Sequence, residues 1–179
     1  RDLLMHRRQI WLPDANKRRK HVLCALNCYW PLGAATISSL PIKCESNVPS
    51  VSGPLRLVEI DLPNWATHCG VNGQLLVPSE VVKTLQVNAE TWKNIDWWLA
   101  AFLLLEAWHE RIWEFRYGPI HSYSFRLKGW DERAWERAWV NRIGLFLRSW
   151  AVECGHKVGA RNLGPLPEFE IRMSHDVDA

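Results

Sequence analysis

The chain has 179 residues, of which 47% are hydrophobic and 23% charged, and its formal net charge at pH 7 is +3. This composition excludes an intrinsically disordered protein, and the small net charge gives no reason to expect nucleic-acid binding. The longest apolar block, residues 95–105, is about half of the roughly twenty residues that a membrane-spanning helix needs. We therefore expect a folded domain with a buried helix and no membrane span.

The first third of the chain predicts strands and loops. Residues 1–20 are polar and basic, and the basic cluster at 17–20 (KRRK) is interpreted as a solvated loop rather than a phosphate-binding patch. Residues 21–28 (HVLCALNC) form a short apolar run that predicts a buried strand, and residues 35–42 predict a second one. Residues 43–54 are rich in Ser, Pro and Gly, which is typical of a loop.

The next segment carries the clearest strand. Residues 55–62 (LRLVEIDL) alternate apolar and charged side chains, as a half-buried strand does. Asn72-Gly73 is a strong turn signal, and residues 69–71 and 75–77 on either side predict a hairpin. Pro78 followed by Ser79 and Glu80 predicts a short helix up to residue 85.

Two helices with many tryptophans follow, because nine of the twelve tryptophans lie between Trp92 and Trp150. The first helix is expected from Asn94 to about Phe115, capped by Thr91 or Asn94, with Asp96 well placed against its dipole. It is apolar enough to be buried on most of its circumference. The second is expected from Trp130 to about Glu153, after the linker 116–129. Its apolar face has helical spacing and comprises Trp135, Ala138, Trp139, Ile143, Phe146, Trp150 and Ala151.

The five cysteines are Cys24, Cys28, Cys44, Cys69 and Cys154, an odd number without the pairing that is typical of zinc sites. We expect them to be buried free thiols in a reducing, cytoplasmic compartment. Cys24 and Cys28 would lie on one face of the predicted strand, which suits buried thiols or a weak metal pair.

This order of elements predicts the α+β fold class: a small mixed or antiparallel sheet packed with the tryptophan-rich helix pair. The domain is expected over residues 1–155, with a Gly- and Pro-rich linker at 156–167 and the first strand of another domain at 168–179. Because the chain begins with Arg1 and its last motif is one that usually opens a domain, we expect a fragment of a longer protein.

The last residues carry the sharpest chemical signal, His175-Asp176-Val177-Asp178. Two carboxylates at positions i and i+2 after a strand can converge on one metal ion. One oxygen then binds the metal while the other takes a proton from the metal-bound water, as in a hydrolase. The alternative is that these are polar loop residues without a role.

Residues 172–178 (RMSHDVD) resemble the first catalytic motif of the polysaccharide deacetylase superfamily, in its His-Asp-x-Asp variant. Residues 96–110 and the helix after them resemble an uncharacterised domain that precedes the catalytic barrel in some bacterial deacetylase-like proteins. The resemblance covers residues 96–178, and residues 1–90 match no family we can name.

The resemblance implies a distorted (β/α) barrel, begun at residues 168–179, that removes acetyl groups from N-acetylated sugars with a divalent metal, often zinc. It implies Asp176 as the general base and Asp178 as a metal ligand, whereas His175 replaces a residue that is usually aromatic or apolar. The metal-binding histidines of the family come from a His-x-x-x-His motif further downstream. The present chain is therefore expected to be inactive alone, to hold no metal, and to pack on that barrel as an accessory domain.

Other functions remain open at this point. The chain could be a non-catalytic interaction or scaffold domain, or a glycosyltransferase whose Asp-x-Asp holds the metal of a nucleotide sugar. A zinc protease is rejected, because Trp113 stands where that motif needs a second histidine after His109 and Glu110. His121 and Ser122 lack the oxyanion-hole glycines and the orienting acid of a nucleophilic pair.

Two surface features are also expected. Glu106, His109 and Glu110 form a polar patch near the end of the first helix, either structural or in contact with the barrel. Most tryptophans belong to the core by their spacing, but an exposed one can stack on a sugar ring. Trp130, which follows Gly129 and lies off the apolar stripe, is the best candidate for such an exposed ring.

Overall fold

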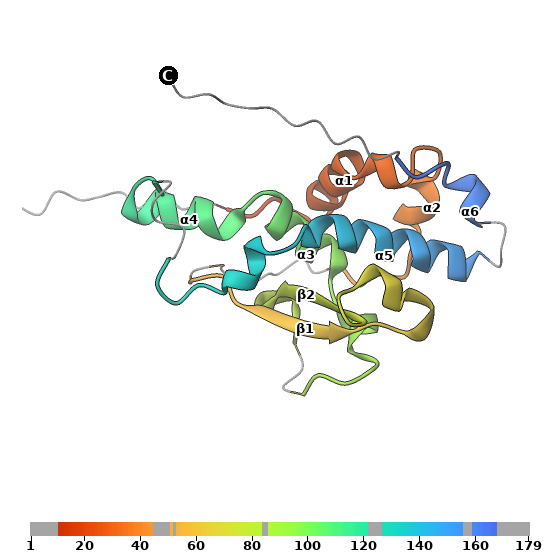
Figure 1. Cartoon of the computed structure of the whole chain (residues 1–179). Coiled ribbons are helices and arrows are strands. Elements are labelled where there is room, and N and C mark those ends of the chain that lie inside the picture. The colour runs from red at the N-terminus through yellow and green to blue at the C-terminus, as the bar shows by residue number, and fades with distance from the viewer. Residues whose placement is uncertain are drawn as a thin grey trace, which may run out of the picture.

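The structure is a computed structural model that describes residues 11–44, 51, 53–83, 86–121, 127–155 and 159–167. The described part is mostly helical and contains one two-stranded antiparallel sheet, as Figure 1 shows. The helices are α1 (Ala15–Ala25), α2 (Ala34–Ser38), α3 (Trp97–Leu105), α4 (Trp108–Tyr117), α5 (Trp139–Cys154) and α6 (Gly159–Asn162). The strands are β1 (Leu57–Asp61) and β2 (Gln74–Pro78).

The two strands predicted for residues 21–28 and 35–42 are wrong, because both segments are helical. Asp14 caps α1 by accepting a hydrogen bond from the backbone N–H of Lys17 at 2.9 Å. Val22 and Leu26 are both buried, and their spacing of four places them on one side of the chain as it leaves α1. Residues 34–38 form α2, which buries Ile37 completely.

The basic cluster 17–20 lies on α1 rather than in a loop, and its members differ in exposure. Arg18 is buried, and its guanidinium donates a hydrogen bond to the backbone oxygen of Pro13 at 2.6 Å. Lys17 is exposed and forms an ion pair with Asp14 at the helix start. These contacts give the cluster a structural role at the beginning of α1.

The strand predicted at residues 55–62 is confirmed as β1. It pairs with β2 in a register that runs from Leu57 opposite Pro78 to Asp61 opposite Gln74. The predicted turn at Asn72-Gly73 is also present, and both residues have positive φ angles, 51° and 78°. Residues 69–71 are not the main partner of β2, since they contribute only the isolated Val71–Gln74 bridge.

The first long helix is interrupted. Asp96 caps α3 through the N–H of Leu99, and α3 ends at Leu105. Ala107 then takes a left-handed conformation, with φ 45° and ψ 48°, before α4 begins. Two separate helices therefore replace the single helix predicted over residues 94–115.

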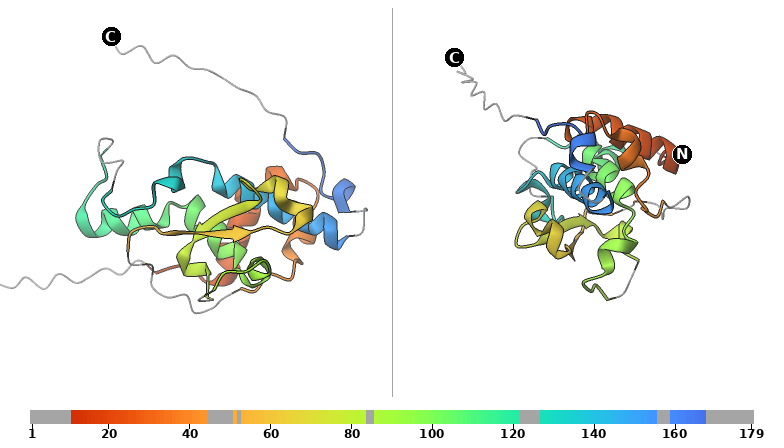
Figure 2. Two further views of the ribbon diagram at one scale, coloured as in Figure 1. Left: turned by 60° about the horizontal axis from the view of Figure 1, so that its bottom comes forward. Right: turned by 90° about the vertical axis from the view of Figure 1, so that its right-hand side faces the viewer.

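The predicted burial of α3 on most of its circumference is confirmed, since every residue from Trp97 to Leu103 is buried. The reason is its central position: α3 contacts α1, α4, α5 and β2. Figures 1 and 2 show the sheet on one side of the helical layer that contains α3 and α5. In the described part of the chain, no helix is both long and apolar enough to cross a lipid bilayer.

The second long helix, α5, starts at Trp139 and not at Trp130. Residues 132–135 before it form a 3-10 helix that is tied to the sheet instead. The N–H of Asp131 donates to the backbone oxygen of Leu55, and the Asp131 carboxylate accepts from the N–H of Leu57. This anchoring to the chain at β1 diverts residues 130–138 from a continuous helix.

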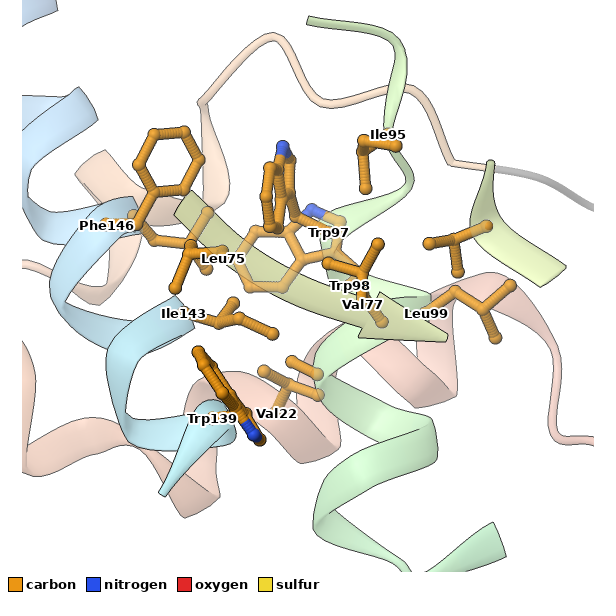
Figure 3. Packing of buried hydrophobic residues seen from close by; sticks show 14 of the residues in the cluster. Val22, Leu75, Val77, Ile95, Trp97, Trp98, Leu99, Trp139, Ile143 and Phe146 are labelled. Carbon is orange, nitrogen blue, oxygen red and sulfur yellow. The ribbon is translucent and has the colours of Figure 1, made fainter. Parts of the chain in front are cut away.

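The aromatic side chains of α3 and α5 meet in the core. Trp97 and Phe146 have ring centroids 4.7 Å apart, and Figure 3 shows them beside Leu75 of β2. The predicted apolar face of the second helix is confirmed for Trp139, Ile143, Phe146, Trp150 and Ala151, which are buried. It is wrong for Trp135 and Ala138, which precede α5 and are exposed. Aromatic packing between α3, α5 and β2 thus forms the centre of the domain.

Candidate functional site

The carboxylates expected to do chemistry, Asp176 and Asp178, lie outside the described residues, and so do His175 and the strand predicted before them. Among the described residues, no group of three or more His, Cys, Asp or Glu side chains is arranged to hold a metal ion. The candidate features of the described part are therefore a row of aromatic rings and two small polar clusters.

At the break between α3 and α4, Glu106 and His109 of the predicted polar patch each pair with a residue of another element, and Glu106 pairs in addition with Arg111 of α4. Glu106 contacts His21 of α1, with its Oε1 2.7 Å from His21 Nε2, and also pairs with Arg111 at 2.7 Å. His109 points inward and lies 2.9 Å from the Glu80 carboxylate. Both pairs connect the helix break to other elements, which indicates a structural role.

Four aromatic rings form a continuous row, which we call the aromatic row: Tyr117, Trp113, Trp130 and Trp135. The centroid distances along it are 4.4 Å, 5.7 Å and 6.2 Å, and the last two rings are nearly parallel, with an interplanar angle of 27°. Tyr117 is 68% exposed and Trp135 is 44% exposed, so both ends of the row meet solvent.

Trp130 was expected to be the exposed tryptophan, and this prediction is wrong, because only 6% of its surface is exposed. Trp130 is the buried centre of the aromatic row, and Trp135 covers it. Trp135 was expected on the buried face of a helix, but it precedes α5 and is not held in the core.

A small cavity of about 60 Å³ adjoins the aromatic row. Its lining consists of Gly53, Pro54, Ile112, Trp113, Arg116 and Tyr117. Pockets that enclose a drug-sized ligand usually measure about 300–1,000 Å³. This cavity therefore suits one substituent of a ligand that lies across the exposed rings, not a whole ligand.

Buried polar groups lie beneath the row. The His109 side chain is only 1% exposed, and its ring centroid is 6.5 Å from that of Trp130. Glu80 Oε2 and Trp130 Nε1 are buried without a hydrogen-bond partner among the described residues. Burying an unpaired polar group costs free energy, so these two groups lower the stability of the folded domain.

An arginine network fixes the segment that carries Trp130 and Trp135. The Arg133 guanidinium pairs with Asp131 at 2.8 Å and with Glu59 of β1 at 2.6 Å. It also donates to the backbone oxygen of Leu57. The hydrogen bond from Arg133 holds the pKa of Asp131 below its usual value, so this carboxylate stays charged at neutral pH.

The Glu80–His109 pair predicts a specific pH dependence of stability. Burial alone would raise the pKa of Glu80, but the hydrogen bond and positive charge of His109 outweigh it and keep this pKa below its ordinary value of 4.5. The unfolded chain therefore takes up the proton first, so the pair stabilises the fold above about pH 4.5 and loses this effect in acid.

We expect Glu80→Gln to remove this part of the acid sensitivity. Between about pH 5 and pH 3, the Tm of the native chain should fall more steeply than that of the variant. Thermal unfolding followed by circular dichroism at several pH values measures the difference. Parallel curves for the two proteins would contradict the assignment.

A second polar cluster joins the end of the 3-10 helix Asn64–Cys69 to α5. His68 Nε2, Cys69 Sγ and Ser149 Oγ form a triangle in which each of the three distances is 3.4 Å. Cys69 is fully buried, and burial raises the pKa of its thiol. The prediction of buried cysteines holds for Cys69 only, since the other four are exposed.

Sequence reasoning missed both the exposed ends of the aromatic row and the His68–Cys69–Ser149 triangle. The adjacent His68 and Cys69 were a visible signal, but Ser149 is 80 positions from Cys69 in the chain. Likewise, Trp135 fits the helical stripe of α5, so its spacing gave no sign of exposure. Only the folded arrangement brings these groups together.

No protein-family model matches this chain, and no curated protein or solved structure is significantly similar to it. The resemblance to polysaccharide deacetylases therefore rests on the motif residues of the sequence alone.

Proposed function

We propose that this chain is the accessory domain of a metal-dependent hydrolase that resembles polysaccharide deacetylases and acts on N-acetylated carbohydrate. In this proposal Asp176 is the general base and Asp178 a ligand of a divalent metal, with zinc the first candidate. The single observation that carries it is the sequence Ser174-His175-Asp176-Val177-Asp178 after a Gly- and Pro-rich segment. The described domain would pack on the barrel that this motif opens.

The aromatic row supports a role in positioning the substrate. Exposed aromatic rings offer flat apolar faces, and pyranose rings present apolar C–H faces that stack on them. Trp135 is held on the buried Trp130, and Tyr117 is held against Trp113, so both exposed rings have rigid support. Arg133, two positions before Trp135 in the chain, pairs with Glu59 of β1, and this charged pair offers hydrogen-bonding groups for sugar hydroxyls.

An interaction domain without enzymatic chemistry is the second candidate. The same exposed aromatic residues favour it, because Tyr and Trp are enriched where proteins bind one another.

Four of the five cysteines are exposed and none forms a disulfide. This agrees with a reducing, cytoplasmic compartment, which we include in the proposal.

The experiment is an assay of the protein in its full genomic length for acetate release from a soluble oligomer of N-acetylglucosamine. Release that requires a divalent metal and is lost in Asp176→Asn supports the proposal. Asp178→Asn should lower the affinity for the metal as well as the rate. A well-folded protein that releases no acetate with Zn²⁺, Co²⁺ or Mn²⁺ would leave the interaction domain as the better account.

A further inference from the structure

We propose that His68, Cys69 and Ser149 form a second metal site, which binds a thiophilic divalent cation such as Zn²⁺. The site belongs to the described domain and does not depend on the proposed deacetylase function. It would connect the 3-10 helix Asn64–Cys69 to α5, two segments that already pack against each other.

The geometry of the triangle fits one face of a metal tetrahedron. Zinc lies about 2.3 Å from a cysteine sulfur and about 2.0–2.1 Å from a histidine nitrogen. With an oxygen ligand at about 2.0–2.2 Å, tetrahedral angles place neighbouring ligand atoms about 3.3–3.7 Å apart. Each pair among His68 Nε2, Cys69 Sγ and Ser149 Oγ is separated by 3.4 Å.

The distance between Ser149 Oγ and His68 Nε2 distinguishes this arrangement from tight hydrogen bonding. Hydrogen bonds between a hydroxyl oxygen and a nitrogen usually measure about 2.7–3.2 Å between heavy atoms. At 3.4 Å the pair is at the long end of hydrogen bonding but at the right separation for two ligands of one ion. The two pairs that include Cys69 Sγ are also 3.4 Å apart, a length that suits a hydrogen bond to sulfur as well as two ligands of one ion.

The surroundings supply access and rigidity. His68 is exposed and Ser149 is half-buried, whereas Cys69 is fully buried, so an ion would approach from the side of His68 and water would take the fourth position. The Arg142 guanidinium donates to the backbone oxygens of Cys69 and Gly70, at 3.2 Å and 3.1 Å, and so fixes the position of Cys69. On binding, the Cys69 S–H bond breaks, its proton passes to solvent, and a metal–sulfur bond forms.

Two strong ligands and one hydroxyl give weaker binding than the three or four strong ligands of most zinc sites. We therefore expect a dissociation constant in the micromolar range. Because the ion binds only the folded chain, saturating Zn²⁺ should raise the Tm.

The test uses Co²⁺ as a spectroscopic probe in the 179-residue chain. Cys24, Cys28, Cys44 and Cys154 are exposed, so their combined replacement with serine leaves Cys69 as the sole thiol. We expect Co²⁺ to produce a thiolate-to-cobalt charge-transfer band in this variant, and stoichiometric Zn²⁺ to remove it. Adding Cys69→Ser should abolish the band, and adding His68→Ala should weaken Co²⁺ binding by about tenfold or more.

Asp178→Asn is the matched control, because it removes the ligand proposed for the deacetylase site and should leave the band unchanged. The proposal is overturned if the folded single-thiol variant shows no band, or if the band persists in full after His68→Ala. It is also overturned if Asp178→Asn removes the band. Circular dichroism of each variant confirms that it is folded.

Discussion

Replacing Trp97 with alanine is expected to lower the free energy of unfolding by about 3–5 kcal/mol, the usual cost of removing a buried aromatic side chain. Trp97 is fully buried and its ring centroid lies 4.7 Å from that of Phe146. Its indole N–H also donates to the backbone oxygen of Trp92 at 2.9 Å. The substitution would open a cavity where α3, α5 and β2 meet and would leave that oxygen without its partner.

Urea denaturation followed by circular dichroism measures this loss. Trp11→Ala is the matched control, since Trp11 is 75% exposed and its loss should change stability by less than about 0.5 kcal/mol. Equal effects of the two substitutions would contradict the central position of Trp97 in the core.

The second large effect is expected at Gly70, between the 3-10 helix Asn64–Cys69 and the turn into β2. A Cβ atom at this position would lie 2.4 Å from the backbone oxygen of Gln74 and 2.7 Å from its nitrogen. Both atoms belong to the Val71–Gln74 hydrogen bonds that close the turn. Since the backbone itself must move, we expect Gly70→Ala to cost about 1–3 kcal/mol.

Gly53→Ala provides the control, because a Cβ atom there meets no other atom within 4 Å. The same denaturation experiment should show a clear loss for Gly70→Ala and almost none for Gly53→Ala. A neutral Gly70→Ala would mean that the turn does not approach Gly70 as closely as the structure shows.

Local sequence patterns predicted some secondary-structure elements correctly and others wrongly. The alternation of residues 55–62 and the Asn72-Gly73 turn are local signals, and both are present in the fold. Residues 21–28 contain a short apolar run that fits a strand or a helix equally well. The helix α1, which includes the first part of this run, packs on α3 more than seventy positions away, and this contact favours the helix.

The start of α5 could not be predicted from local sequence patterns either. The tryptophan stripe continues at helical spacing back to Trp135, but contacts of Asp131 and Arg133 with β1 hold this segment outside the helix. These partners are 74 positions apart along the chain, so no local pattern reports them.

The candidate sites also differ in whether the sequence alone can reveal them. The carboxylates Asp176 and Asp178 are two positions apart in the sequence and form a motif that can be read directly. The aromatic row and the His68–Cys69–Ser149 triangle each combine residues from separate elements. The contacts of Trp113 with Trp130 and of Cys69 with Ser149 follow from the folded arrangement, since residue spacing does not report contacts between separate elements.

The most direct test of the substrate-positioning role is a calorimetric titration of the 179-residue chain with a soluble oligomer of N-acetylglucosamine. If the proposed role is right, we expect saturable binding that weakens by about tenfold, equivalent to about 1.4 kcal/mol, in Trp135→Ala and in Tyr117→Ala. Trp11→Ala, at an exposed tryptophan outside the row, should bind as the native chain does. Absence of saturable binding, or binding that both row variants retain in full, would show that the aromatic row does not position a carbohydrate substrate.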